Sequence, residues 1–203
     1  RSPSRGLGDV YKRQQLYFNV KSKLSCNQHG FMNSRSTVTN LCLLTQYISE
    51  TLDQRGQVDV LYTDLSKAFD CIDHRLLLNK LSVFGCNPNT LNLFESYLQH
   101  RPSHVSYNGF CSHTFTASSG VPQGSNLGPL FFNIFINDLF DLIDVKSLGY
   151  ADDLKIYIKI NDVSDCQQMQ SSLNKVKSWC DQNNLKLNIN KCIALTFTKK
   201  MDP

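Results

Sequence analysis

Three aspartates stand at places in the sequence where their carboxylates could hold a metal ion. Asp152 and Asp153 are adjacent in a short acidic turn, and Asp64 follows an apolar stretch, residues 58–63, that predicts a buried strand. Adjacent carboxylates repel each other, and a cation between them relieves that repulsion. If the strands that carry them are neighbours, Asp64 and Asp152 converge. Such hard oxygen ligands suit Mg²⁺ or Mn²⁺, and two ions of this kind could assist an in-line phosphoryl displacement.

The same aspartates also have an ordinary explanation. Aspartate favours turns because its side chain bonds to nearby backbone groups, so an Asp-Asp pair in a hairpin turn is common. Asp64 could simply cap the segment that follows it. From these residues alone, a metal site and ordinary turn chemistry remain open alternatives.

Apolar periodicity predicts helices and antiparallel strands around these aspartates. The expected helices span residues 36–52, 76–84, 89 or 90 to about 100, 129–143 and about 164–180. The expected strands span 58–63, 185–189 and 193–197, with hairpins around Asn108-Gly109 and over 146–160. Because these elements do not follow a strict βαβ alternation, the predicted fold class is α+β.

The net charge of +4 is unevenly distributed along the chain. Four of the 21 basic residues and one of the 17 acidic residues lie in residues 1–14, which leaves a net charge of only +1 for residues 15–203. Residues 1–14 lack apolar periodicity, and no apolar region typical of a signal peptide follows them. We therefore expect this segment to be a non-native leader or a disordered tail.

Composition excludes several classes of protein. With 41% hydrophobic and 19% charged residues, the chain is typical of a globular protein and unlike a disordered chain, a collagen or a coiled coil. No stretch approaches the ~20 apolar residues that a membrane-spanning helix needs, so we expect no membrane partner. The eight cysteines show neither Cys-x-x-Cys nor zinc-ligand spacing, which favours reduced thiols in an intracellular protein over a disulfide framework.

The segments around the aspartates are more specific than the aspartates themselves. In order, they are QHGFMNSRST at 28–37, YTDLSKAFDCIDH at 62–74, SGVPQGSNLGPLFFNIFINDL at 119–139, LGYADD at 148–153 and NLKLNINKC at 184–192. Their order and spacing resemble motifs of the reverse transcriptases of non-LTR (LINE-type, jockey-like) retrotransposons. The resemblance extends over residues 15 to about 200, and a coincidence of all five strings is not a serious alternative.

This resemblance implies a right-hand polymerase palm, an antiparallel sheet packed on helices, with a partial fingers segment. It implies an RNA-directed DNA polymerase, a nucleotidyltransferase that joins a dNTP to a primer 3′-OH. Asp64 and Asp152 would hold two Mg²⁺ or Mn²⁺ ions, and Asp153 would complete the acidic cluster. One ion would lower the pKa of the 3′-OH, while the other would hold the triphosphate and stabilise the departing pyrophosphate.

The family's pattern also implies residues that bind the nucleotide. Phe69, five residues after Asp64, matches a steric gate whose ring excludes a 2′-OH, with a core phenylalanine as the alternative. Gln123 and Gly124 match the loop that lines the nascent base pair, where glycine permits close approach of the backbone. The alternative for both is an ordinary Gly/Pro loop before a helix. Lys191 would donate a proton to pyrophosphate or contact a phosphate, unless it is simply solvated.

Two further residues are implied to contact the primer and the template. Tyr150 would pack near the primer end, and Arg35, near a predicted helix start, would contact a template phosphate. Met32 stands where many relatives carry a basic residue, which weakens a template contact there. The implied partners are an RNA template, a DNA primer and dNTP. The implied location is intracellular, in the nucleus and in a cytoplasmic ribonucleoprotein.

The resemblance divides the chain into three parts. Residues 1–14 are the expected leader, residues 15–55 a partial fingers segment, and residues 56–203 a palm with no thumb after it. We therefore expect a fragment that is inactive alone. An alternative from another class is a non-catalytic remnant or interaction domain derived from a retroelement. An aspartate-based nuclease or metallohydrolase is a third, but it leaves residues 119–139 unexplained.

Overall fold

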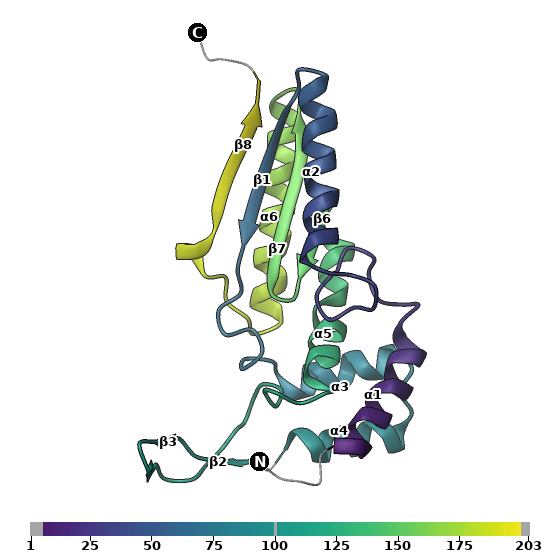
Figure 1. Cartoon of the computed structure of the whole chain (residues 1–203), viewed down its shortest axis with the longest axis vertical. Helices are drawn as coiled ribbons and strands as arrows, with labels where there is room; N and C mark the ends of the chain where they lie inside the picture. The colour runs from purple at the N-terminus through teal and green to yellow at the C-terminus, as the bar shows by residue number, and fades with distance from the viewer. Residues whose placement is uncertain (1–5, 100, 200–203) are drawn as a thin grey trace. The chain divides into compact units, whose positions relative to one another are not determined.

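The computed structural model describes residues 6–99 and 101–199 (Figure 1). The chain divides into two compact units. The first unit comprises Arg1–Lys23 and Lys67–Phe135, and the second unit comprises Leu24–Ser66 and Ile136–Pro203. Neither unit is therefore a continuous stretch of sequence, and each contains segments that are far apart along the chain.

A four-stranded antiparallel sheet forms the centre of the second unit. Its strands lie in the order β6, β7, β1, β8. Their bounds are Gln57–Thr63 for β1, Lys146–Tyr150 for β6, Asp153–Ile160 for β7 and Ile193–Thr198 for β8. The predicted strands at 58–63 and 193–197 and the predicted hairpin at 146–160 are confirmed. β1 is a central strand, because it pairs with both β7 and β8.

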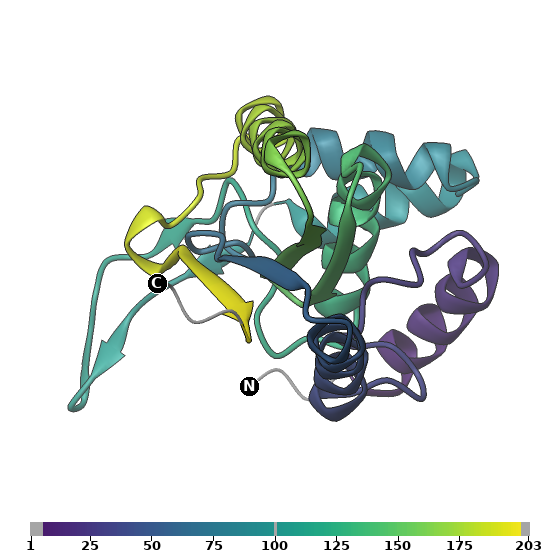
Figure 2. The ribbon, with the colours of Figure 1, turned by 90° about the horizontal axis from the view of Figure 1, so that it is seen from above.

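Two helices cover opposite faces of this sheet, as Figure 2 shows. Helix α2, Thr37–Asp53, packs Leu44 against Val58 and Val60 of β1. Helix α6, Val163–Gln182, lies on the other face. Burying an aliphatic side chain of this size contributes about 1.5–3 kcal/mol relative to leaving it exposed. Helices on both faces therefore fix the central strands, and with them the residues at the strand ends.

Side-chain caps set where both helices begin. Ser36 Oγ accepts a hydrogen bond from Thr39 N at 3.2 Å, and Thr39 Oγ1 accepts one from Ser36 N at 2.9 Å, so α2 begins where predicted. Helix α6 begins earlier than the predicted residue 164, because Asp162 caps it. The Asp162 carboxylate accepts from Ser164 N at 2.7 Å, and the Asp165 carboxylate accepts from Asp162 N at 3.3 Å.

The predicted strand over residues 185–189 is wrong. Residues Ile189–Lys191 form a short 3₁₀ helix, η2. The main chain of this segment bonds to the residues that follow β1, with Asn188 N donating to Asp64 O at 2.8 Å. The alternating residues 185–189 therefore belong to a segment that is hydrogen-bonded to the end of the sheet.

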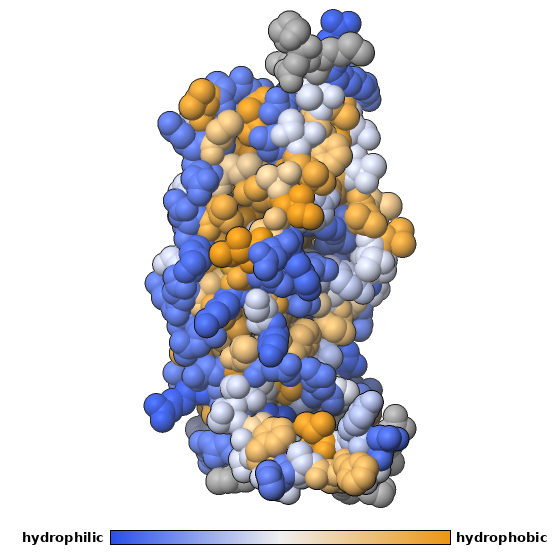
Figure 3. All heavy atoms as spheres, turned by 90° about the vertical axis from the view of Figure 1, so that its left-hand side faces the viewer, coloured by the Kyte–Doolittle hydropathy of each residue, from blue (hydrophilic) through white to orange (hydrophobic). Residues whose placement is uncertain are grey.

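β8 lies at an edge of the sheet, and its side chains are largely exposed. Ile193 and Leu195 are 55% and 44% exposed. Figure 3, which faces the left-hand side of Figure 1, shows apolar side chains gathered in the upper part of this surface. The strand thus holds its place by pairing with β1 rather than by burial of its own side chains.

The first unit contains helices and two very short two-stranded sheets, β2–β5 and β3–β4. Its elements are α1 (Gly6–Val20), α3 (His74–Val83), α4 (Pro88–Leu98), β2 (Pro102–Ser103), β3 (Ser106–Tyr107), β4 (Phe110–Cys111), β5 (Phe115–Thr116) and the first part of α5 (Gly128–Leu142). Helix α5 runs on into the second unit from Ile136. The β3–β4 turn is Asn108-Gly109, with φ of 49° and 84°, which confirms the predicted hairpin.

Helix α4 begins earlier than predicted. Its cap is Asn87 rather than Asn89 or Thr90, because Asn87 Oδ1 accepts from Thr90 N at 2.9 Å. Pro88 follows in the first turn, where its missing N–H costs nothing. Gly85 ends the preceding helix at a φ of 95°, the left-handed conformation that the sequence predicts there.

Residues 6–14, expected to be a non-native leader or a disordered tail, form the first part of α1. Leu16 and Val20 of the same helix are 4% and 1% exposed. Residues 6–14 are therefore helical rather than disordered, and their non-native origin stays a prediction. Residues 1–5 lie outside the described residues. The predicted boundary at residue 56 falls inside the second unit, because α2 packs on β1 there.

No helix in the described part of the chain is long and apolar enough to cross a membrane. All eight cysteines are free thiols. Cys180, predicted on an apolar helix face, is buried, and burial raises the pKa of its thiol to about 11. Cys166, predicted on the same face, is exposed in the first turn of α6.

Candidate active site

Antiparallel pairing brings Asp64 and the Asp152-Asp153 pair to the same end of the sheet. β1 ends at Thr63, directly before Asp64, and Thr63 lies opposite Leu154, the second residue of β7. Asp152 and Asp153 therefore lie across from Asp64 where β1 ends. This is the convergence that the sequence predicts for neighbouring strands.

The three carboxylates influence one another through their charges. Burial raises the pKa of Asp152 above its ordinary value, and the charges of Asp153 and Asp64 raise it further. A hydrogen bond from its own backbone and the ammonium group of Lys191 act in the opposite direction. The ionised form of Asp152 is therefore costly here, and a nearby cation would stabilise it.

Asp64 has two polar partners on the segment around η2. Lys191 Nζ lies 3.3 Å from Asp64 Oδ2, and Asn188 Nδ2 donates to the same oxygen at 3.1 Å. Neither contact involves Oδ1. Lys191 is 67% exposed against 15% for Asp64, so this ion pair contributes at most about 1 kcal/mol. The prediction missed Asn188, although it stands within the segment NLKLNINKC.

The acidic cluster is not a ready-made metal site in this structure. Among residues 6–99 and 101–199, no group of three or more histidine, cysteine, aspartate or glutamate side chains is arranged so that it could hold a metal ion. The positive charge beside Asp64 is the Lys191 ammonium group.

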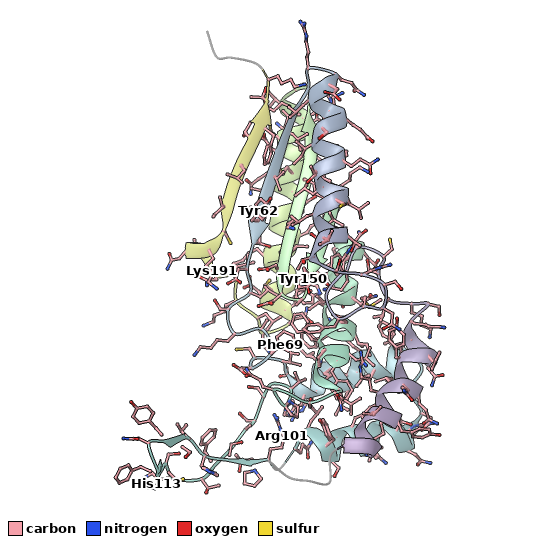
Figure 4. All side chains as sticks on the ribbon, viewed as in Figure 1. Tyr62, Phe69, Arg101, His113, Tyr150 and Lys191 are labelled. Atoms are coloured by element: carbon pink, nitrogen blue, oxygen red, sulfur yellow. The ribbon has the colours of Figure 1, made fainter. Side chains whose placement is uncertain are left out.

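A cavity of about 440 Å³ opens beside Asp64 and Asp153, and Asp152 is not among the residues that line it. Asp64, Asp153, Tyr150 and Lys191 line it, so it gathers four of the predicted site residues. Figure 4 shows Tyr150 and Lys191 on two sides of the end of β1, with Tyr62 on the strand itself. The cavity therefore joins the end of the sheet to the segment around η2.

Lys155 lines the same cavity and was not predicted. Its Nζ donates to Asn40 Oδ1 at 2.6 Å. Burial lowers the pKa of Lys155, whereas the charge of Asp153 acts in the opposite direction. The available signal was a lysine in the strand that follows the acidic turn, two residues after Asp153.

A buried glutamine holds the turn that carries Asp152. Gln28 is 3% exposed, and its Oε1 accepts hydrogen bonds from Ala151 N at 3.0 Å and Gly30 N at 2.7 Å. Its Nε2 donates to Ala151 O at 3.1 Å. Ala151 has a φ of 55°, a left-handed conformation that costs a residue with a side chain roughly 1–2 kcal/mol. The prediction missed Gln28, although it begins the segment QHGFMNSRST.

Arg35, predicted to contact a template phosphate, bonds to the protein's own main chain. Its Nη1 donates to the carbonyl oxygens of Gln28 at 2.6 Å, Cys26 at 2.8 Å and Ser25 at 3.3 Å. Arg35 thereby holds the segment that carries Gln28. This arrangement gives the residue a structural role and lends no support to the phosphate contact.

Three of the predicted nucleotide-binding residues lie in the first unit. Phe69 is half-buried and stacks on Phe132, with ring centroids 4.3 Å apart and planes at 17°. Gln123 is exposed, and its Nε2 donates to Asp70 Oδ1 at 2.9 Å. Gly124 has a φ of 72°, and among the described residues no atom lies within 4 Å of the place a Cβ would take. Its backbone conformation, rather than crowding by the chain, thus favours glycine there.

The glycine-rich loop is bonded to the segment that contains Phe69. Val121 N donates to Phe69 O at 2.9 Å. Gly120 leaves no room for a side chain, since a Cβ would lie 2.6 Å from Asp70 O. Phe69 and Gln123 therefore belong to one block within the first unit.

Comparison with known proteins places the chain in a family. The family model described as reverse transcriptase (RNA-dependent DNA polymerase) matches residues 8–202. This chain belongs to that family. It is 30% identical over 183 residues to the "Probable RNA-directed DNA polymerase from transposon BS" of Drosophila melanogaster. It is 28% identical over 183 residues to the RNA-directed DNA polymerase from mobile element jockey of the same species. The resemblance to reverse transcriptases of non-LTR retrotransposons is thus confirmed.

The alignments cover 86% and 85% of the chain but only 20% of each relative, so this reverse transcriptase chain spans about a fifth of their length. Solved structures agree in fold. A telomerase from Candida albicans, in complex with a fragment of telomeric RNA, matches with a TM-score of 0.66 at 15% identity, over 92% of this chain and 34% of that one. An apo telomerase from Candida tropicalis, truncated from its C-terminal domain, matches with a TM-score of 0.68 at 14% identity, over 96% of this chain and 41% of that one. The α+β class and the polymerase palm are confirmed.

Proposed function

We propose that this chain is the catalytic palm of an RNA-directed DNA polymerase that joins deoxynucleotides to a primer 3′-OH. The observation that carries the proposal is the convergence of Asp64 and Asp152 at one end of the sheet, in a chain of the reverse transcriptase family. Fold alone would not suffice, because one fold serves many functions. The acidic cluster is the local chemistry that selects this one.

Reverse transcriptase domains generally use divalent metal ions, and the carboxylates at this end of the sheet have the donor chemistry for such ions, although they are not arranged as a group that holds one. Carboxylate oxygens are the ligands that Mg²⁺ and Mn²⁺ prefer. Charge repulsion on Asp152 would be relieved by a cation, and Asp64 keeps Oδ1 outside its contacts with Lys191 and Asn188. We propose that Asp64 and Asp152 hold two ions and that Asp153 adds negative charge beside them.

When bound, the two ions would lower the pKa of the primer 3′-OH and stabilise the charge on the departing pyrophosphate. The protein's own groups would position the reactants. Lys191, exposed at the rim of the cavity, would contact a phosphate or donate a proton to pyrophosphate. Tyr150, in the same cavity, would pack near the primer end.

We assign nucleotide selection to the first unit. The exposed Gln123 amide would hydrogen-bond to the template or the nucleotide, and its bond to Asp70 would orient it beforehand. The Phe69 ring, held by stacking on Phe132, would exclude a 2′-OH and so select deoxynucleotides. Gly124 would let the backbone approach the nascent base pair.

The proposed partners are an RNA template, a DNA primer and dNTP. Membership of the reverse transcriptase family, whose model matches residues 8–202, supports a nucleic-acid template. An enzyme that copies an element's RNA into DNA would meet its template in a cytoplasmic ribonucleoprotein and its target in the nucleus. We therefore propose an intracellular protein in both settings.

Primer extension tests this function. A longer polypeptide that carries this chain, with the source element's reading frame on both sides, is incubated with a DNA primer annealed to an RNA template, dNTPs and Mg²⁺. We expect the primer to lengthen to the end of the template, and we expect no product when Asp64→Asn replaces the wild type.

Two outcomes would contradict the proposal. Primer shortening that depends on Asp64 would indicate a nuclease. No change in the primer, with duplex binding retained, would indicate a non-catalytic remnant of a retroelement.

A further inference from the structure

We propose that Gln28 is a positioning residue that fixes the turn carrying Asp152 and thereby places this carboxylate for a metal ion. The inference rests on the proposed function, because it assigns Gln28 a part in the same site. Asp152 lies directly after Ala151, and Ala151 is the residue to which the Gln28 side chain makes two hydrogen bonds.

Both the oxygen and the nitrogen of the Gln28 amide bond to Ala151. Oε1 accepts from Ala151 N at 3.0 Å, and Nε2 donates to Ala151 O at 3.1 Å, so the donor and the acceptor of one residue are both satisfied by one side chain. These two bonds reach the peptide units before and after the Ala151 Cα, so they fix the orientation of the residue as well as its position. Because Gln28 is 3% exposed, water does not compete freely for these bonds.

The two hydrogen bonds to Gln28 hold Ala151 in a backbone conformation that alanine does not favour. Ala151 has a φ of 55°, which an alanine rarely adopts without support from its surroundings. Without the two bonds, we expect Ala151 to relax and to carry the Asp152 backbone with it. The Asp152 carboxylate would then leave the place opposite Asp64.

The segment around Gln28 is itself firmly attached to β6. His29 N donates to Gly149 O at 2.8 Å, and Gly149 N donates to Asn27 O at 2.8 Å. Gly30 lies so close to the turn that a Cβ on it would be 2.2 Å from Ala151 N. Gln28 therefore bonds to the turn from a segment that main-chain hydrogen bonds attach to β6.

Residues that orient metal ligands typically change metal affinity or activity by about 10–100-fold when they are mutated. Gln28→Met keeps the length of the side chain and removes its three bonds, two to Ala151 and one to Gly30 N. In the wild-type chain we expect Mn²⁺ binding, measured by electron paramagnetic resonance, that Asp152→Asn abolishes. We expect Gln28→Met to weaken this binding by about 10–100-fold and to speed hydrogen exchange at the Ala151 amide without metal.

Gln46→Met is the matched control, because Gln46 is exposed on α2 and bonds to Glu50. It should change neither measurement. Circular dichroism reports whether Gln28→Met still folds. If it does not, Gln28→Glu carries the test, since it keeps an oxygen for the two N–H groups, loses the donor to Ala151 O and adds a negative charge beside the turn. We expect this variant to lose less Mn²⁺ affinity than tenfold but more than the control.

The outcomes separate this inference from the function on which it rests. A wild-type chain without Asp152-dependent Mn²⁺ binding would contradict the proposed metal site itself. The wild type could instead bind Mn²⁺ while a folded Gln28 variant binds it with equal affinity and shows unchanged hydrogen exchange at the Ala151 amide. That result would contradict only the role of Gln28.

Discussion

At the scale of single residues, the proposed site depends on a carboxylate whose ionised form is unfavourable where it lies. Asp152 is half-buried and faces the charges of Asp153 and Asp64, which raise its pKa in addition to the effect of burial. Such a cost is typical of a functional site, where a residue is kept for its chemistry rather than for stability. It leads to a prediction about the unliganded protein.

Asp152→Asn should raise the melting temperature of the metal-free chain at pH 7. A folded-state pKa above the unfolded value means that the carboxyl group contributes stability at low pH and loses that contribution as pH rises through the folded pKa. At pH 7 the ionised group is therefore destabilising, and an amide avoids this cost. Each kcal/mol gained raises the melting temperature by about 2–4 °C in a chain of this size.

Thermal unfolding followed by circular dichroism measures this effect. Asp141→Asn, at an exposed position on α5, serves as the control and should leave the melting temperature nearly unchanged. A melting temperature for Asp152→Asn below that of the wild type at pH 7 would show that the carboxylate is not strained by its neighbours.

Phe69→Ala should admit ribonucleotides. The ring is half-buried and stacked on Phe132, so it is held in one orientation and offers a fixed steric barrier. Removing it should lower the preference for dNTP over the matched rNTP on the order of tenfold or more in single-nucleotide incorporation. Phe110→Ala, on an exposed hairpin, should not change the preference. An unchanged preference in Phe69→Ala would remove Phe69 from this role and favour a core function.

At the scale of elements, the site is a consequence of strand order. β1 is flanked by β7 and β8, so the end of β1 meets the β6–β7 turn on one side and the segment around η2 on the other. The face of the sheet that packs on α2 includes Tyr157, which is 5% exposed, with its ring 5.1 Å from that of Tyr47. This face keeps the strands in register.

Tyr157→Phe should make the second unit more resistant to alkali. Burial raises the pKa of Tyr157 to about 12, and Tyr47 raises it in the same direction. The buried phenol therefore contributes stability below its unfolded pKa of about 10, and this contribution is lost as pH rises towards 12. A phenylalanine has no proton to lose. Urea unfolding at pH 8 and pH 11.5 measures the difference.

Tyr107→Phe, which changes a highly exposed tyrosine, is the control for this measurement. It should lose as much stability between pH 8 and pH 11.5 as the wild type. If Tyr157→Phe also loses as much as the wild type, ionisation of Tyr157 does not govern the alkaline stability of this sheet.

The sequence predicted the elements whose signals are local. The apolar stretch before Asp64 predicted β1, and Asn108-Gly109 predicted the β3–β4 hairpin, because both signals lie within a few residues. Residues 185–189 alternate between apolar and polar without forming a strand, since their partners lie beyond the end of β1. Gln28 was missed because its bonds reach Ala151, 123 residues away. Such contacts leave no periodic pattern in the sequence.

At the scale of the whole molecule, the site residues divide between two units. The acidic cluster, Tyr150 and Lys191 lie in the second unit, whereas Phe69 and Gln123 lie in the first. Net charge was a poor guide to the proposed function, because residues 15–203 carry only +1. The carboxylates that we propose to hold cations lower the positive balance of the chain, so the pattern of acids is more informative than the total charge.

The most direct test of the central claim is metal-dependent primer extension by the longer polypeptide that carries this chain. Wild type, Asp152→Asn and Asp141→Asn are compared on a DNA primer annealed to an RNA template, over a range of Mg²⁺ concentrations. We predict extension by the wild type and by Asp141→Asn, and none by Asp152→Asn at any Mg²⁺ concentration. Extension by Asp152→Asn at the wild-type rate would contradict the assignment of the metal site.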